Sequence, residues 1–307
     1  MIKEIIDKLV ALLAVSALLA SCSESELWQN PQTEARDGYI MLNFKTEIPA
    51  MQEVVTRAVD PDGGGVQDMT LFCFDSYGLF ISTVKAGVTV QKPGPGEMEG
   101  TFKAEVPENT RTIHFLANQN MDEFKEDSFR NKSESEVMAV LEGSSGRMIY
   151  WGRFACDAGN DSNIAEQMAT SGNSVKLIRN HARISVDNPD NNGHIVITGF
   201  AVCNTNAFGT VAPHHPKKGF DFTWPSSDDP FVTLPVNDAK MSDITDVTSS
   251  MNQYVFECEN SADAPVSVIL RGHLPDQDEE KYYRVLLVDD KGEQLLVRRN
   301  HHYKLHI

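Results

Sequence analysis

Hydrophobic and polar residues alternate at every second position in many short runs, which are separated by Gly, Pro, Asn and Asp. This period is typical of strands that bury one face. The runs of the first half are YIMLNFKTEI, MTLFCF, GTFKAEV, RTIHFLA, RMIYWGRF and VKLIRNHARISV. Those of the second half are HIVITGFAVCN, QYVFECE, APVSVILRG, KYYRVLLVDD, EQLLVRR and HHYKLHI. The pattern predicts a mainly β protein.

Two segments depart from the alternation and predict short helices. The segment 133–142 begins with Ser133 and Glu136, which have the spacing of a capping box. The segment 162–168 carries apolar residues four positions apart. We expect both helices to decorate the first domain.

The boundary between two predicted domains is the segment NPDNNGH, residues 188–194, which holds turn formers and no apolar residue. It divides the folded part of the chain into domains 38–190 and 191–307, each long enough to bury its own core. A tether, residues 22–37, precedes them.

The start of the chain predicts a lipoprotein signal peptide over residues 1–21. Lys3 and Lys8 precede an apolar run, residues 9–20, that is too short to cross ~30 Å of hydrocarbon as a helix. The run ends in LASC, which looks like a bacterial lipobox with Cys22 as the lipid attachment site. The alternative is an ordinary signal peptide with a chance cysteine. The lipid interpretation predicts a protein anchored at the outer membrane, on the cell surface.

Charge narrows the choice of partners. The chain has 44 acidic and 27 basic residues and a net charge of −17. This balance argues against a basic patch that binds nucleic acid. Proteins, sugars or cations are the favoured partners.

The cysteines that remain after Cys22 are too sparse for a disulfide scaffold. Cys73 with Cys156 and Cys203 with Cys258 would pair within the predicted domains. Four buried free thiols are the favoured alternative.

Motifs for catalysis, cofactors or metals are not found. The sequence lacks GxSxG, HExxH, a P-loop and a dinucleotide-binding GxGxxG. His302 and His306 of the last run would lie ~13 Å apart on one strand face, too far to share a metal. We therefore predict surface or edge histidines, no metal site, no cofactor and no enzymatic activity.

Arg57 and Ala58 lie between the first predicted strand and the turn DPDGGG. Exposed loops of this kind are where proteases cut.

The chain resembles the fimbrillin family of the Bacteroidota. The resemblance rests on the lipobox, on TRA at 56–58, on IHFLANQN, LIRNHARISV and GFAVCNTNAFGTVAP, and on the tail with YVFECEN, VSVILRG, YYRVLLVDD and RRNHHYKLHI. It implies two transthyretin-like β-sandwich domains in tandem and a structural or adhesive subunit of a surface fimbrium. The implied partners are other fimbrial subunits and host or bacterial surface ligands.

The resemblance also implies assembly by donor-strand exchange. An arginine-specific protease would cut between Arg57 and Ala58 and release the first strand, whose core-facing residues are Ile40, Leu42, Phe44 and Ile48. Loss of that strand would open an apolar groove for a strand of another subunit. The chain ends at residue 307, where family members commonly continue, so either the last strand is short or the sequence is truncated. A tip component that only accepts a partner would fit the second case.

A surface-exposed glycan-binding lipoprotein is the alternative function. Trp151, Trp224, Tyr282 and Tyr283 could stack on sugar rings, although such residues in strands more often pack in cores or on sheets.

Overall fold

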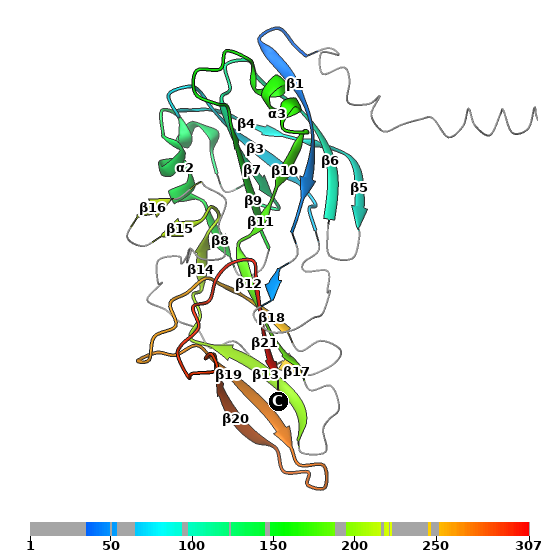
Figure 1. Cartoon of the computed structure of the whole chain (residues 1–307), viewed down its shortest axis with the longest axis vertical. Helices are drawn as coiled ribbons and strands as arrows, with labels where there is room; N and C mark the ends of the chain where they lie inside the picture. The colour runs from blue at the N-terminus through cyan, green and yellow to red at the C-terminus, as the bar shows by residue number, and fades with distance from the viewer. Residues whose placement is uncertain are drawn as a thin grey trace, which may run out of the picture.

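Most of the strands that the structure describes form two pairs of facing sheets (Figure 1). The computed structural model describes residues 35–49, 51–53, 65–93, 98–122, 124–144, 148–187, 195–215, 218–220, 222, 245–246 and 252–306. One pair of sheets lies at each end of an elongated molecule. The predicted mainly β sandwich architecture is confirmed.

The first pair of sheets, here called the N-terminal sandwich, encloses a continuous apolar core. One sheet has the order β10 (Ser174–Lys176), β1 (Tyr39–Glu47), β6 (Met98–Pro107) and β5 (Gly87–Pro93). The other has the order β11 (Ile178–Arg179), β9 (Tyr150–Ala155), β7 (Thr112–Ala117), β3 (Met69–Phe74) and β4 (Phe80–Lys85). Side chains from both sheets meet between them, among them Leu42, Phe102 and Phe115.

The second pair, the C-terminal sandwich, is built in the same manner. One sheet has the order β18 (Asn252–Phe256), β12 (His181–Asp187), β21 (His301–His306) and β2 (Gln52–Glu53). The other has the order β17 (Thr245–Asp246), β13 (Val196–Cys203), β19 (Ser267–His273) and β20 (Lys281–Leu286). Its core holds Ile184, Phe200 and Leu270.

A helical layer covers the outer face of the five-stranded sheet. It contains the 3-10 helix η2 (Glu126–Phe129) and the helix α2 (Glu134–Val140). The predicted capping box is present: Ser133 accepts from the Glu136 backbone N–H, and the Glu136 carboxylate accepts from the Ser133 N–H at 2.8 Å. Val137 and Met138 of α2 pack with Phe72, which lies on the face of β3 that points away from the sandwich core.

The second helix, α3 (Ile164–Thr170), also has a capping box, formed by Asn163 and Glu166. It begins two residues later than the segment predicted from the sequence. Ile164 and Met168 join the core of the N-terminal sandwich, where α3 contacts β1.

Two small sheets lie near the junction of the sandwiches. β8 (Glu142–Ser144) pairs with β14 (Phe208–Thr210), and β15 (His214–His215) pairs with β16 (Gly219–Phe220). Gly209 and Gly143 are opposite each other in the first of these sheets. A Cβ at either position would lie 2.3–3.1 Å from the ring of Phe256, so both positions require glycine for this packing.

The local pattern did not predict which sheet each strand joins. The run VKLIRNHARISV contributes to three sheets, because β10 pairs with β1, β11 pairs with β9, and β12 pairs with β18 and β21 of the C-terminal sandwich. β12 therefore lies on the opposite side of the junction from the position expected for it. The division at residue 190 stays a prediction.

One predicted strand was wrong, and several strands were missed, the longest of which are β4 and β5. EQLLVRR forms no regular strand; Gln294 and Val297 make only isolated bridges, to Val288 and Cys258. β4 and β5 were not predicted, since FISTVK and GVTVQKP alternate only weakly.

Candidate functional site

The first strand begins in a defined turn. The Tyr39 N–H donates to the Arg36 carbonyl at 2.9 Å, and Gly38 adopts a φ of 78°, which favours glycine. The Arg36 guanidinium lies 4.3 Å from the Tyr39 ring centroid, and its Nε donates to Glu105 Oε2 at 2.8 Å. These contacts attach the start of β1 to β6.

β1 is an internal strand. It pairs antiparallel with β6 from Tyr39 opposite Pro107 to Thr46 opposite Gly100. Its last three residues also pair parallel with β10. Both neighbours come from much later in the chain, so removal of β1 would leave backbone groups on β6 and β10 without their partners.

The side chains of β1 that were predicted to face the core do so, as does that of Ile48, the residue directly after the strand. Leu42 is 1% exposed, Phe44 and Ile48 are 0% exposed, and Ile40 packs at the margin of the core. The Phe44 ring stacks on Phe102 with centroids 5.5 Å apart and meets Phe115 edge-on at 5.0 Å. Without β1 this volume would be an apolar groove.

The chain then crosses from one sandwich to the other. After Ile48, the Pro49 carbonyl accepts a hydrogen bond from Arg179 Nη1 at 2.6 Å. Met51 is buried, and β2 pairs parallel with β21 at His301 and His302. The N-terminal segment thus occupies a position in each sandwich.

The predicted processing residues Cys22, Arg57 and Ala58 lie outside the described residues, as does Trp224. The four predicted core residues of the first strand, in contrast, face the same core: Ile40, Leu42 and Phe44 lie on one face of β1, and Ile48 is the residue directly after it. The sequence also missed residues that matter here: Arg179, Arg299 and Glu257 are charged yet fully or almost fully buried. A charged residue inside an apolar run, as in LIRN, is the signal that marks them.

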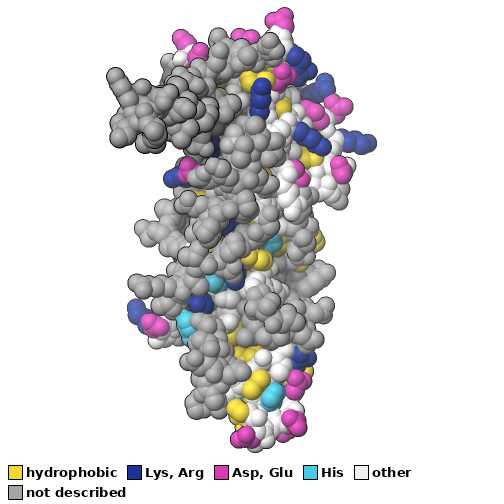
Figure 2. Space-filling view, turned by 90° about the vertical axis from the view of Figure 1, so that its right-hand side faces the viewer, with side chains coloured by type: hydrophobic (Ala, Val, Ile, Leu, Met, Phe, Trp, Pro, Cys, Tyr) yellow, Lys and Arg dark blue, Asp and Glu magenta, His cyan; other side chains and the backbone are white. Residues whose placement is uncertain are grey.

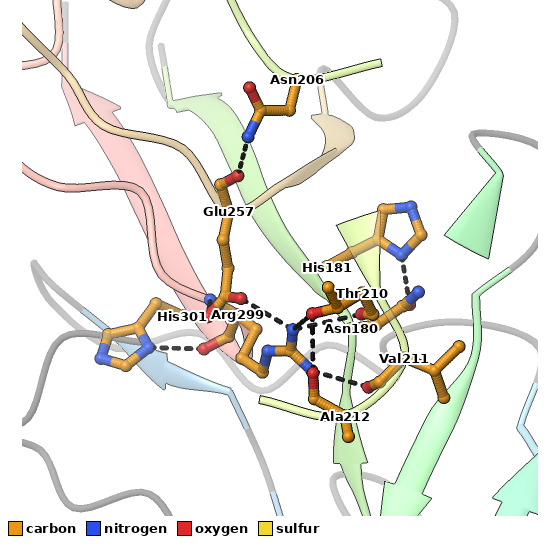
Figure 3. A network of polar contacts seen from close by, with 9 residues as sticks. All are labelled: Asn180, His181, Asn206, Thr210, Val211, Ala212, Glu257, Arg299 and His301. Atoms are coloured by element: carbon orange, nitrogen blue, oxygen red, sulfur yellow. Dashed lines mark hydrogen bonds and ion pairs between the residues drawn. The ribbon is translucent and has the colours of Figure 1, made fainter. Parts of the chain in front are cut away.

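A buried ion pair occupies the junction of the two sandwiches (Figure 3). Arg299 Nη2 lies 2.8 Å from Glu257 Oε2, and the two side chains are 1% and 0% exposed. Arg299 Nη1 donates to the Val211 carbonyl at 2.7 Å, and Nη2 donates to Thr210. Burial raises the pKa of Glu257, and the Arg299 guanidinium and backbone N–H oppose that rise.

His181 forms the other side of this junction. Its Nδ1 lies 2.6 Å from Asn180 Oδ1, which also accepts from the Ile149 N–H, so Nδ1 carries the proton and donates. The imidazole packs on the Phe256 ring at 4.1 Å. Burial and the nearby Arg299 charge lower the pKa of His181 to about 3.

A second polar cluster, under α2, has the residue types of an acid–base site. Glu134 accepts from His114 Nε2 at 2.7 Å and from Arg153 Nε at 2.7 Å. Burial would raise the pKa of Glu134, but hydrogen bonds from His114 and Arg153 outweigh it and bring the pKa to about 2. Trp151 Nε1 donates to His114 Nδ1 at 3.0 Å. Both ring nitrogens are thus occupied, which favours a structural role.

The residues considered for sugar binding separate into two groups. Trp151 is 1% exposed and belongs to the apolar layer under α2, so it cannot stack on a ligand. Tyr282 and Tyr283, on the edge strand β20, are 60% and 36% exposed. Figure 2 shows hydrophobic side chains at the lower end of the molecule, where Figure 1 places β19 and β20.

The C-terminal histidines are not all at the surface. His302 is 4% exposed and its Nε2 lies 2.7 Å from Ser185 Oγ, so the expectation of a surface or edge residue was wrong there. β21 is an internal strand, which is why His302 is covered. Among the residues that the structure describes, no three His, Cys, Asp or Glu side chains form a group that could hold a metal ion.

The cysteines agree with the favoured prediction of free thiols. Cys73, Cys156, Cys203 and Cys258 form no disulfide, and all except Cys156 are buried. Burial raises the pKa of Cys73 and of Cys258 to about 12, so these thiols stay protonated and unreactive.

No family model and no curated protein matches this chain. Solved structures do. A candidate cell-adhesion protein from Parabacteroides distasonis is 14% identical, with 87% of each chain covered and a TM-score of 0.54. The tip fimbrial protein Mfa3 from Porphyromonas gingivalis, with a C-terminal truncation, is 14% identical, with 86% of this chain and 94% of that chain covered and a TM-score of 0.51.

This chain shares their fold. At 14% identity, this likeness establishes the fold. In the part of the chain that the structure describes, no helix has the length and apolar character needed to cross a membrane.

Proposed function

We propose that the protein is a structural and adhesive subunit of a cell-surface fimbrium, without enzymatic activity. In this proposal it is exported as a lipoprotein through Cys22 and assembled by donor-strand exchange after cleavage between Arg57 and Ala58. The proposal is supported by the shared fold with a tip fimbrial protein and a candidate cell-adhesion protein.

The observation that carries the proposal is the position of β1. It is the first of the described strands and is internal in its sheet. It supplies Leu42 and Phe44 to the core, which Ile48 joins directly after the strand. Both β1 and β2 precede Arg57, so a cut there would detach a segment that contributes to both sandwiches. A strand from another subunit would restore the main-chain hydrogen bonds and fill the groove.

Cleavage and assembly are tested together. Refolded precursor is treated with an arginine-specific protease, and the products are examined by N-terminal sequencing and by SDS gel electrophoresis without boiling. We expect a product that begins at Ala58 and forms SDS-resistant oligomers. Arg57→Lys is the matched control, because it keeps the charge and removes the cleavage site. A stable product that remains monomeric would count against assembly.

The lipid is tested by mass spectrometry of the mature N-terminus. A lipidated Cys22 and a free Ala58 cannot be the ends of one mature chain. We expect lipidated Cys22 in cells that lack the arginine-specific protease and Ala58 in fimbriae. An unmodified Cys22 in the precursor would overturn the export route.

A further inference from the structure

Arg179 lies where the N-terminal segment passes from one sandwich to the other. It is the last residue of β11 and is 3% exposed. Its Nη1 donates to the Pro49 carbonyl at 2.6 Å and to Asn300 Oδ1 at 2.8 Å. The guanidinium also lies 5.8 Å from the centroid of the Tyr150 ring. Arg179 therefore joins the segment to both sandwiches through one buried group.

The segment is anchored on both sides of this contact. Ile48 is 0% exposed and Met51 is 6% exposed, and β1 and β2 lie immediately outside them. Proline has no N–H, so the backbone at Pro49 offers only an acceptor, which matches a donor such as Arg179.

We propose that Arg179 is a positioning residue that holds the end of the strand in the β1 groove by binding a backbone carbonyl directly after its last core residue. The inference rests on the function proposed above. The segment that Arg179 would bind is an extended strand of a second subunit. This strand would carry apolar residues at the places of Leu42, Phe44 and Ile48. The carbonyl of the next residue would accept from Arg179, and an apolar residue would follow two positions farther on.

Hydrophobic alternation alone does not hold the strand where it leaves the core of the N-terminal sandwich. The apolar core that the segment fills includes Ile48, and the next residue is held by the hydrogen bond from Arg179 to the Pro49 carbonyl. A donor strand that ended before this place would leave the buried Arg179 charge without that acceptor, which is unfavourable. The arginine therefore favours a strand that continues past the core as an extended chain.

The test uses the full chain with a specific protease site inserted between Arg57 and Ala58, so that cutting does not depend on the natural site. After cutting, a labelled peptide of residues 35–53 competes with the resident segment, and its binding is measured by fluorescence anisotropy. A second peptide has the Pro49 carbonyl replaced by a thiocarbonyl, which is a weaker acceptor. A third ends at Ile48 and therefore lacks the Pro49 carbonyl.

We expect the native peptide to displace the resident segment and the two altered peptides to bind about tenfold more weakly or worse, the effect of losing a hydrogen bond to a charged group. In Arg179→Met the native and thiocarbonyl peptides should bind equally. Arg153→Met is the matched control: it removes a half-buried arginine of the same sheet that bonds Glu134 instead, and should keep the discrimination.

The outcomes separate the two proposals. If the native peptide never displaces the segment, the exchangeable groove is wrong, and the positioning role of Arg179 fails with it. If the native and thiocarbonyl peptides bind the unmutated protein equally well, the Arg179 inference alone is wrong. That comparison needs no variant of the protein, so it stands even if Arg179→Met fails to fold.

Discussion

The two sandwiches hold the same N-terminal segment by different means. In the N-terminal sandwich, β1 is an internal strand whose Leu42 and Phe44, together with the following Ile48, are enclosed by apolar side chains. In the C-terminal sandwich, β2 is a two-residue edge strand, and the crossing before it is held by the hydrogen bond from Arg179 to Pro49. The attachment of β1 depends mainly on the burial of apolar side chains, and that of the crossing before β2 depends mainly on polar contacts.

This difference continues into the interior. Around β1 the packing is aromatic, with Phe44, Phe102 and Phe115 in contact. At the junction, the buried groups are the ion pair of Arg299 and Glu257 and the side chain of His181. Apolar cores tolerate exchange of side chains of similar volume, whereas buried polar groups need each partner at its place. In the proposed assembly, the first region would accept a foreign strand, and the second would determine its position.

The largest effect on stability should come from a substitution in the apolar core around β1. Phe44→Ala should lower the free energy of unfolding by ~4 kcal/mol, because it removes a buried ring from a packed core. Urea denaturation followed by tryptophan fluorescence measures it. Asn43→Ala, on the opposite face of the same strand, should cost well under ~1 kcal/mol. Equal losses of unfolding free energy for Phe44→Ala and Asn43→Ala would contradict the view that apolar burial holds β1.

Loss of the buried ion pair should have the second largest effect on stability. Glu257→Ala should cost ~3 kcal/mol, because it leaves the Arg299 charge buried without its carboxylate. The double variant Glu257→Ala with Arg299→Met should be more stable than Glu257→Ala alone. Costs that simply add in this double-mutant cycle would show that the two side chains act independently.

Acid should weaken the junction through His181. The pKa of His181 is about 3 in the folded chain and ordinarily 6.5, so the unfolded chain binds the extra proton between these values. Stability therefore falls as the pH falls from 6.5, by ~2 kcal/mol between pH 6.5 and 5. Unfolding curves at both pH values, compared with those of His181→Gln, isolate this effect. Parallel pH profiles for the two proteins would contradict it.

The smallest effect should lie outside both regions. Ser133→Ala removes the capping hydroxyl of α2 and should cost ~1 kcal/mol in thermal or urea unfolding. Ser135→Ala, two residues further along and exposed in the first turn of the same helix, should be nearly neutral. A larger loss than for Glu257→Ala would mean that the helical layer, and not the junction, limits stability.

Features that depend on neighbouring residues could be predicted from the sequence. The alternation of Leu42 and Phe44 indicated β1 and its buried face, and Ser133 with Glu136 indicated the start of α2. Both signals lie within a few residues, where local geometry decides which side chains share a face or form a cap.

Features that depend on distant partners could not be predicted from the sequence. The contact of Arg179 with Pro49 joins residues 130 positions apart, and alternation says nothing about which strand pairs with which. EQLLVRR has the alternation of a strand but makes only isolated bridges, and His302 is covered because β2 pairs on the outer side of β21. The core-facing residues of the candidate site were thus predictable, and the polar contacts that position them were not.

The antiparallel pairing of β1 with β6 has a mechanical consequence. Its hydrogen bonds run perpendicular to the strands. A force directed along β1 therefore loads the bonds from Tyr39 to Thr46 in shear, all at once, whereas a force directed sideways would open them one by one. A chain of subunits joined through strands in this position, pulled along its length, would resist tension at every joint with a whole ladder.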